Sequence, residues 1–178
     1  MLSNSSVQEQ ELEAVILGLR LKRCWAVIAG RGTGSAIDLH FGAKVPRKRP
    51  LTNPTLGDEE RRFEGETSIY LTCAWRLDDK SKVVSGWLDG GETVEEMVRG
   101  LKSLVGNTVE AIEIQSPAWD LKITFDSGIT LTIFADQTSL VDNDDNYSVF
   151  HGLQGYTVGT RSHVRREASD RPETATPA

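Results

Sequence analysis

The chain has 178 residues, 38% of them hydrophobic and 26% charged, with a formal net charge of −6. These values are typical of one globular domain with its own core, and they exclude a chain without folded structure. No apolar run approaches 18 residues and no basic segment followed by an apolar stretch opens the chain, so we expect a cytosolic protein that does not enter a membrane. Its two cysteines, Cys24 and Cys73, lie in predicted apolar strands and are expected to be reduced core thiols.

The first predicted element is a helix that begins after Ser6. Ser6 and Glu9 have the spacing of a capping box, in which each side chain bonds a backbone N–H at the other residue. Gly18 is suited to end the helix. Apolar side chains recur between them at helical spacing: Leu12, Val15, Ile16 and Leu19. We therefore expect an N-terminal helix, with a loosely docked arm as the alternative.

A hairpin is predicted next, from the apolar runs 21–29 and 36–41 joined by the glycine-rich loop 30–34. The loop lacks the lysine and the following helix of a phosphate-binding loop, so a hairpin connection is the favoured interpretation. In the second run Asp38 and His40 alternate with apolar residues and are expected on a solvated face. Such a pair could orient an imidazole for catalysis, but a plain surface pair is the more common meaning of this pattern.

The stretch 44–62 contains three prolines and the basic run 47–49, and we interpret it as a mobile, solvated loop. The run 63–77 that follows is predicted to be one strong strand. One face of this strand carries Tyr70, Thr72 and Arg76. A short strand at 83–84 is expected after a turn.

The loop 85–91 holds a large aromatic side chain, Trp87. Packing beneath the next helix is the favoured role for this side chain, and an exposed binding anchor is the alternative. The next helix is predicted over 93–105, because Thr93 and Glu96 fit a second capping box and a stripe of apolar residues follows them.

The strongest pattern is in residues 106–136, where three runs alternate between apolar and polar residues. The runs are 108–115, 119–125 and 129–133. Pro117 separates the first two runs, and Gly128 permits a tight turn between the last two because it can adopt a positive φ. The expected product is a three-stranded antiparallel meander, on which the apolar stripe of the helix 93–105 should lie.

Negative charge gathers in the same half of the chain. Residues 106–158 hold eight carboxylates and one basic residue, Lys122, a net charge of −7. Such a surface repels phosphate backbones, so we expect no nucleic-acid partner and favour a basic protein partner. The predicted binding residues are Trp87 and three carboxylates: Asp120, Asp126 and Asp136. Acidic residues that only confer solubility are the alternative.

The turn 142–146 is rich in oxygen-bearing side chains. Its carboxylates are Asp142, Asp144 and Asp145. Tyr147 stands where a calcium loop requires glycine, and no glutamate closes the loop, so an ordinary turn is favoured over a cation site. The histidines and cysteines lack the spacing of a zinc site, and we expect no cofactor.

Two short edge strands, 147–150 and 156–158, are expected before the C-terminal tail. From residue 160 onward the chain has almost no apolar content. We therefore expect residues 1–159 to form a single α+β domain and residues 160–178 to be disordered.

Three motifs occur together in the first three quarters of the chain. They are Cys73-Ala74-Trp75-Arg76, Phe41-Gly42 and the hairpin Leu121–Phe125 with Leu131–Phe134. In these motifs the chain resembles a widespread set of small, uncharacterised bacterial proteins, over about residues 16–136. The resemblance implies a shared fold and a bacterial cytosol, and it implies no reaction.

The expected fold is α+β, with one mainly antiparallel sheet of about six or seven strands covered by the helix 93–105 and an N-terminal helix. No catalytic motif stands out. The predicted function is a non-enzymatic interaction module, such as an immunity or accessory protein, that binds a basic protein partner through an acidic surface. The alternative is a small hydrolase or ligand-binding protein with a pocket at the sheet end, built on Asp38, His40 or the carboxylates near Asp136. The sequence does not indicate the oligomeric state.

Overall fold

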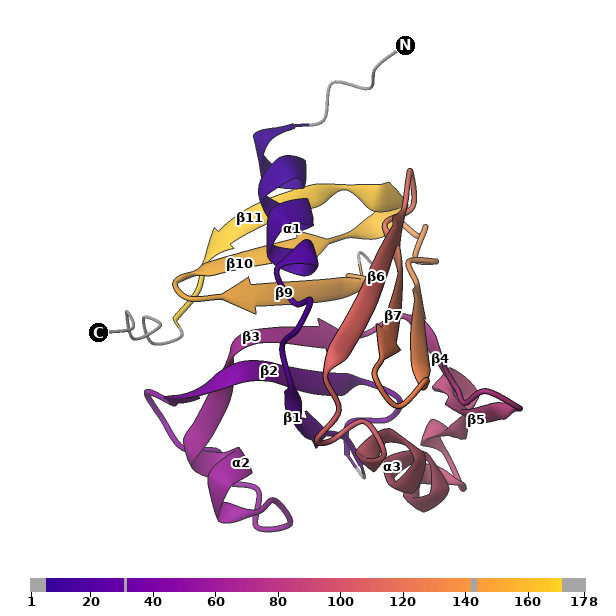
Figure 1. Ribbon diagram of the computed structural model, residues 1–178. Helices are drawn as coiled ribbons and strands as arrows, with labels where there is room; N and C mark the ends of the chain where they lie inside the picture. The colour runs from indigo at the N-terminus through magenta and orange to yellow at the C-terminus, as the bar shows by residue number, and fades with distance from the viewer. Residues whose placement is uncertain (1–5, 31, 142–143, 171–178) are drawn as a thin grey trace.

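The structure is a computed structural model, and it describes residues 6–30, 32–141 and 144–170. Within these ranges the chain folds into two antiparallel sheets with few helices (Figure 1). The prediction of an α+β fold built mainly on antiparallel strands is confirmed. The prediction of a single sheet is wrong, because the strands divide into one six-stranded and one five-stranded sheet.

The six-stranded sheet has the strand order β1-β2-β3-β9-β10-β11. Its strands are β1 (Cys24–Ile28), β2 (Ile37–Pro46), β3 (Phe63–Leu71), β9 (Tyr147–His151), β10 (Gln154–Val158) and β11 (Val164–Ala168). β1 and β2 form the predicted hairpin. The two predicted edge strands are not edges, because β9 pairs with both β3 and β10, and β11 continues the sheet beyond β10.

β11 lies within the segment that we expected to be disordered. A short 3-10 helix, η2 (Thr160–Ser162), leads into it, and the whole strand pairs with β10. Two ion pairs hold this polar strand: Arg165 with Asp145 at 2.6 Å and Arg166 with Glu11 at 3.0 Å. The prediction fails because ladder hydrogen bonds and charges can fix an edge strand that carries little apolar surface. Residues 171–178 lie outside the described ranges.

The five-stranded sheet has the strand order β5-β4-β8-β7-β6. Its strands are β5 (Val83–Gly86), β4 (Ala74–Asp78), β8 (Thr130–Phe134), β7 (Asp120–Phe125) and β6 (Val109–Gln115). β6, β7 and β8 are the predicted meander, and Gly128 adopts a φ of 84° in the turn before β8. This part of the prediction is confirmed, because alternation and a glycine turn are local signals.

The chain passes from one sheet to the other at Thr72, inside the run that we predicted to be a single strand. The Thr72 N–H donates to the Asn146 carbonyl at 2.9 Å, and its hydroxyl donates to the Asp145 carbonyl at 2.7 Å. These bonds end β3, and β4 begins two residues later in the other sheet. A second junction joins Arg23 to Thr108 as an isolated bridge. The buried faces of the two sheets enclose the core, whose largest side chains are Trp75, Tyr147, Phe41 and Phe125.

Two helices close the space between the sheets. α1 (Val7–Leu17) has the predicted capping box at Ser6 and packs against β6, β9 and β11 (Figure 1). α3 (Val94–Lys102) packs mainly against β1, β5 and the 3-10 helix η1 (Trp87–Gly90), rather than on the meander as predicted. The second capping box is also wrong, because the Thr93 hydroxyl donates to the Asp89 carbonyl at 3.2 Å and caps no N–H of α3.

The stretch 44–62 is more ordered than the sequence suggests. β2 continues to Pro46, and a short helix, α2 (Asp58–Arg62), precedes β3. The Arg47 N–H donates to the Arg62 carbonyl at 2.8 Å, which closes the segment between them into a loop. In the described part of the chain, no helix is long and apolar enough to cross a membrane.

Candidate functional site

The glycine-rich loop between β1 and β2 is attached to the second sheet through Ser35. The Ser35 hydroxyl donates to the Trp87 carbonyl, and the Trp75 indole N–H donates to the Ser35 carbonyl at 2.9 Å. Gly90 permits this close approach, since a Cβ atom there would come within 2.8 Å of the Ser35 nitrogen. The loop therefore ties β1 and β2 to β4 and η1, where the two sheets meet.

Three hollows border this loop. The first, which we call the β1 groove, has a volume of about 400 Å³ and includes Gly30 and Thr33 in its lining. The second, the Trp87 cleft, has a volume of about 510 Å³ and includes residues 33–36. The third, of about 450 Å³, is lined mainly by glycines of this loop and of residues 90–91, together with Glu92 and Val94. All three volumes lie in the range of ordinary ligand sites.

The Trp87 cleft combines aromatic rings, hydroxyl groups and carboxylates. Its main side chains come from three separate stretches of the chain: Tyr70 and Thr72 at the end of β3, Trp87 in η1, and Asp144, Asp145 and Ser148 at the start of β9. Tyr70 is 41% exposed and Trp87 is half-buried. The cleft therefore presents apolar ring surface beside negative charge, which suits a ligand that is both flat or aliphatic and cationic.

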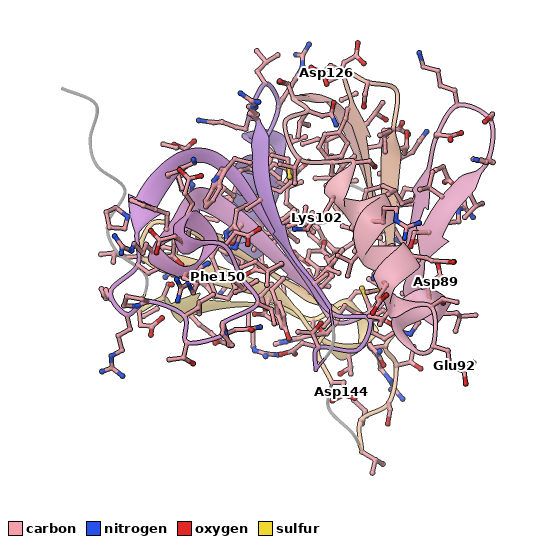
Figure 2. The ribbon with its side chains drawn as sticks, turned by 90° about the horizontal axis from the view of Figure 1, so that it is seen from below. Asp89, Glu92, Lys102, Asp126, Asp144 and Phe150 are labelled. Carbon is pink, nitrogen blue, oxygen red and sulfur yellow. The ribbon has the colours of Figure 1, made fainter. Side chains whose placement is uncertain are left out.

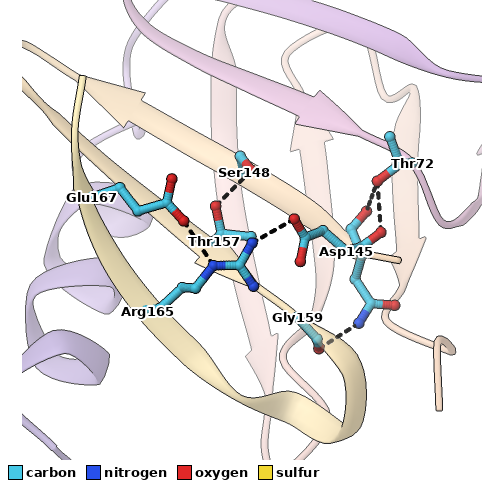
Figure 3. A network of polar contacts seen from close by, with 8 residues as sticks. Thr72, Asp145, Ser148, Thr157, Gly159, Arg165 and Glu167 are labelled. Carbon is cyan, nitrogen blue, oxygen red and sulfur yellow. Dashed lines mark hydrogen bonds and ion pairs between the residues drawn. The ribbon is translucent and has the colours of Figure 1, made fainter. Parts of the chain in front are cut away.

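Asp145 is held in place by a network that Figure 3 shows. Arg165 donates one hydrogen bond to the Asp145 carboxylate at 2.6 Å and another to Glu167 at 2.7 Å. The hydrogen bond to Asp145, and then that to Glu167, raises the pKa of Arg165 above its ordinary value. Ser148 and Thr157 bond each other at 2.8 Å beside them. The Asp145 carboxylate is thus already paired within the protein, with an arginine that it shares with Glu167.

Asp144 differs from its neighbour. Its side chain is exposed, and within the described ranges no ion pair or hydrogen bond of its carboxylate is present. In Figure 2 Asp144 and Glu92 project outward along one margin of the molecule. Asp144 is therefore the carboxylate of the Trp87 cleft that remains available to a ligand.

The cation site that was the weaker alternative for the turn 142–146 finds no support in the described residues. Asp142 lies outside them, and Asp145 is paired with Arg165. The described side chains contain no group of three histidine, cysteine or carboxylate residues that could hold a metal ion.

The three carboxylates predicted to bind a partner have other positions. Asp120 accepts the Ala135 N–H at 2.7 Å, and Asp126 accepts the Thr108 N–H at 3.1 Å, so both fix the backbone of the meander. Asp136 is exposed. None of the three lines a hollow beside the glycine-rich loop, whereas Trp87 does.

His40 is not on a solvated face as predicted, because its side chain is fully buried. Its Nδ1 accepts the Gly65 N–H at 3.1 Å, and its Nε2 lies 3.3 Å from the Asp38 carboxylate. Since Nδ1 accepts a hydrogen bond, we assign the ring proton to Nε2, which donates to Asp38. The Trp25 ring covers the imidazole, with 5.6 Å between the ring centroids.

A buried ion pair completes this cluster. Arg47 donates to Glu64 at 3.1 Å, and the two side chains are only 10% and 7% exposed. The Arg47 guanidinium also lies 3.3 Å from His40 Nε2, which with this tautomer is a contact between two N–H donors and not a hydrogen bond, so the Asp38 carboxylate is the acceptor that Nε2 faces. Both ring nitrogens of His40 are therefore engaged inside the protein, and the cluster joins β2 to β3 rather than opening to a substrate.

Sequence reasoning identified Trp87 and placed Tyr70 and Thr72 together on one strand face. It missed Ser35, because nothing local shows that a loop serine bonds a distant carbonyl. Sequence reasoning also did not predict that Tyr70 and Asp144 lie close together, because their proximity depends on the pairing of β3 with β9.

The chain was compared with protein-family models, with curated proteins and with solved structures, and none of these comparisons gives a match. The resemblance of residues 16–136 to a set of small bacterial proteins stays a prediction.

Proposed function

We propose that this protein is a non-enzymatic binding module that receives a basic side chain of a protein partner in the Trp87 cleft. The observation that carries the proposal is the presence of two aromatic rings, Tyr70 and Trp87, in one cleft with the exposed carboxylate of Asp144. A lysine or arginine side chain matches this lining, because its aliphatic stem packs on rings while its charge meets the carboxylate.

Two interactions favour such binding. A cation over an aromatic face contributes about 0.5–2 kcal/mol, depending on how far it is removed from water. Charge complementarity mainly raises the association rate, and the net charge of −6 attracts a basic partner over longer distances. A partner with several basic residues would therefore be drawn to the molecule and anchored in the cleft.

An immunity or accessory protein is the biological role that fits this chemistry. Such a protein acts by occupying a partner's surface and needs no reaction of its own. We expect the partner to be met in a bacterial cytosol, where Cys24 and Cys73 stay reduced.

The alternative, a small hydrolase built on Asp38 and His40, has weaker support. The two side chains do lie within 3.3 Å of each other, but the imidazole is buried and both its nitrogens are engaged. A general base must reach the proton that it removes from a substrate.

The experiment uses an acetylated tetra-arginine amide as the probe and a tetraglutamate amide as its control. Indole N–H resonances of the ¹⁵N-tryptophan-labelled protein are followed by NMR, and the Trp87 signal is assigned with Trp87→Phe. The tetra-arginine peptide should shift the Trp87 signal and leave that of Trp25, which lines none of the three hollows, in place. The tetraglutamate peptide should shift neither.

Two cleft variants complete the test. Trp87→Ala and Tyr70→Ala should each weaken tetra-arginine binding by about tenfold, equivalent to ~1.4 kcal/mol. Trp87→Phe keeps a ring and should lose less, which separates ring contact from general disturbance. An unmoved Trp87 signal, or equal binding by wild type and Trp87→Ala, would refute the proposal.

A further inference from the structure

Most hydroxyl groups that line the Trp87 cleft already bond other parts of the protein. Thr72 donates to the Asp145 carbonyl at 2.7 Å, and Ser148 bonds Thr157 at 2.8 Å (Figure 3). Two further hydroxyl groups, both in the glycine-rich loop, donate to backbone carbonyls: those of Thr33 and Ser35. All four side chains are committed to the fold before a ligand enters the cleft, so they offer it little hydrogen bonding.

Two polar groups of the cleft remain available to a ligand. With the other described residues, the Asp144 carboxylate forms no ion pair and the Tyr70 hydroxyl forms no hydrogen bond. Asp145 is paired with Arg165. The aromatic rings of Tyr70 and Trp87 accept no N–H donor as a carbonyl does, but their faces attract a cation. The cleft therefore offers ring surface and one unpaired negative charge, and few acceptors for N–H donors.

We propose that the Trp87 cleft selects trimethylated lysine, a quaternary ammonium group on a side chain of the protein partner. This inference rests on the proposed function, because it names the form of the basic side chain that the same cleft receives. An unmodified lysine brings three N–H donors and an arginine five, and each donor that loses water without gaining an acceptor costs free energy. A trimethylammonium group brings no donor. It keeps its positive charge, and its methyl groups pack on the rings while the charge faces Asp144.

Charge and access separate this ligand from others of similar shape. A neutral tert-butyl group fits the same space but gains nothing from the Asp144 carboxylate or from the electrostatic attraction of the ring faces. A phosphocholine headgroup carries a phosphate beside its ammonium group, and the net charge of −6 disfavours that phosphate. Sites for free small molecules enclose most of their ligand, whereas this cleft is open to the surface, because Tyr70 is 41% exposed. The cleft therefore suits a side chain that enters from a partner.

The test titrates the full chain, uniformly labelled with ¹⁵N, with acetylated pentapeptide amides that have glycine at every position except the central one. The central residue is trimethyllysine, lysine, arginine or the neutral analogue of trimethyllysine in which carbon replaces the quaternary nitrogen. Choline is the fifth ligand. The trimethyllysine peptide should shift the Trp87 indole signal and bind about tenfold or more tightly than each of the other four ligands, because only it combines a donor-free cation with an aliphatic stem.

Protein variants locate the interaction. Tyr70→Phe keeps the ring and removes the hydroxyl group, so it should bind the trimethyllysine peptide like wild type, whereas Tyr70→Ala removes the ring and should weaken binding by about tenfold. Asp144→Asn removes the charge and keeps the shape, and should weaken binding by about threefold or more. Asp136→Asn, at an exposed carboxylate outside the cleft, is its control and should bind like wild type. Unfolding midpoints show whether each variant is folded.

The outcomes separate this inference from the proposed function. If the lysine or arginine peptide shifts the Trp87 signal and binds as tightly as the trimethyllysine peptide, the cleft receives a basic side chain without selecting its methylated form, and only this inference is overturned. Equal binding of the neutral analogue would show an apolar site that makes no use of charge, and equal binding of choline would show a site for a free small molecule. Either result overturns the inference. A Trp87 signal that no ligand shifts would overturn both proposals.

Discussion

The His40 cluster and the Trp87 cleft contain similar residues and behave in opposite ways. Each brings aromatic rings beside charged side chains. In the His40 cluster the ring and the ion pair of Arg47 with Glu64 are buried. In the Trp87 cleft Tyr70 is 41% exposed and Asp144 is open to solvent.

Residue type therefore does not distinguish the closed cluster from the open cleft in this protein. Burial and pairing do. A charge that is enclosed and paired is committed to the fold, because exposing or unpairing it costs several kcal/mol. A charge that is exposed and unpaired contributes little to the fold and can meet a ligand at low cost.

The largest effect is expected from breaking the closed cluster. Arg47→Ala leaves the Glu64 carboxylate buried without its partner, and should reduce the free energy of unfolding by about 3–5 kcal/mol. Urea unfolding measures the loss. Arg76→Ala, which breaks an exposed pair with Asp78, is the matched control and should cost less than about 1 kcal/mol. Equal losses of stability in the two variants would show that the ion pair of Arg47 with Glu64 is not buried.

A smaller loss is expected on removing β11, the strand that supports the Trp87 cleft through Arg165. A chain ending at Gly159 lacks β11, which uncovers the β10 edge and one side of Tyr156 and frees Asp145 from Arg165. The free energy of unfolding should fall by at least about 2 kcal/mol, comparable with the exposure of one apolar side chain. A chain ending at Asp170 is the control. An unchanged midpoint in the shorter chain would mean that β11 contributes nothing.

The thiols of Cys24 and Cys73 show how well the core excludes water. Burial raises the pKa of Cys24 and of Cys73 to about 12, with the nearby Asp136 carboxylate adding to the effect at Cys73. In the unfolded chain a thiol loses its proton near pH 8.5, so the folded state retains protons that the unfolded state has released.

The contribution of these thiols to stability is therefore complete below about pH 8.5 and declines as the pH rises toward 12. Urea midpoints at pH 7.5 and 9.5 should show this decline, and Cys73→Ala should show a shallower one. A thiol reagent at pH 8 should label neither cysteine before unfolding. Rapid labelling of the folded protein would contradict the assignment of both thiols to a closed core.

The elements that could be predicted from the sequence are those whose signals lie in residues close together along the chain. The capping box of Ser6 and Glu9 begins α1, and strict alternation with a glycine turn produces β7 and β8. The split of one predicted strand into β3 and β4 was not visible, because buried positions continue through Cys73 and the signal to stop is a pair of bonds from Thr72 to a distant segment.

The His40 cluster and the Trp87 cleft show the same limit of prediction from the sequence. His40 was predicted on a solvated face because strand alternation cannot show that Trp25 and Arg47 cover that face. Trp87 was identified by its size and its place in a loop. Its companions Tyr70 and Asp144 come together through the pairing of β3 with β9, and both lie near Trp87 only in the folded chain, which no local pattern contains.

The most direct test compares Asp144→Lys with Asp136→Lys. Both carboxylates are exposed, and both changes raise the net charge equally, but only Asp144 lines the Trp87 cleft. The affinity for the tetra-arginine amide should fall by about tenfold or more in Asp144→Lys and by less than about threefold in Asp136→Lys, because screening at physiological salt weakens distant charges. Equal losses of affinity in the two variants would contradict binding in the Trp87 cleft and would assign the binding to the acidic surface as a whole.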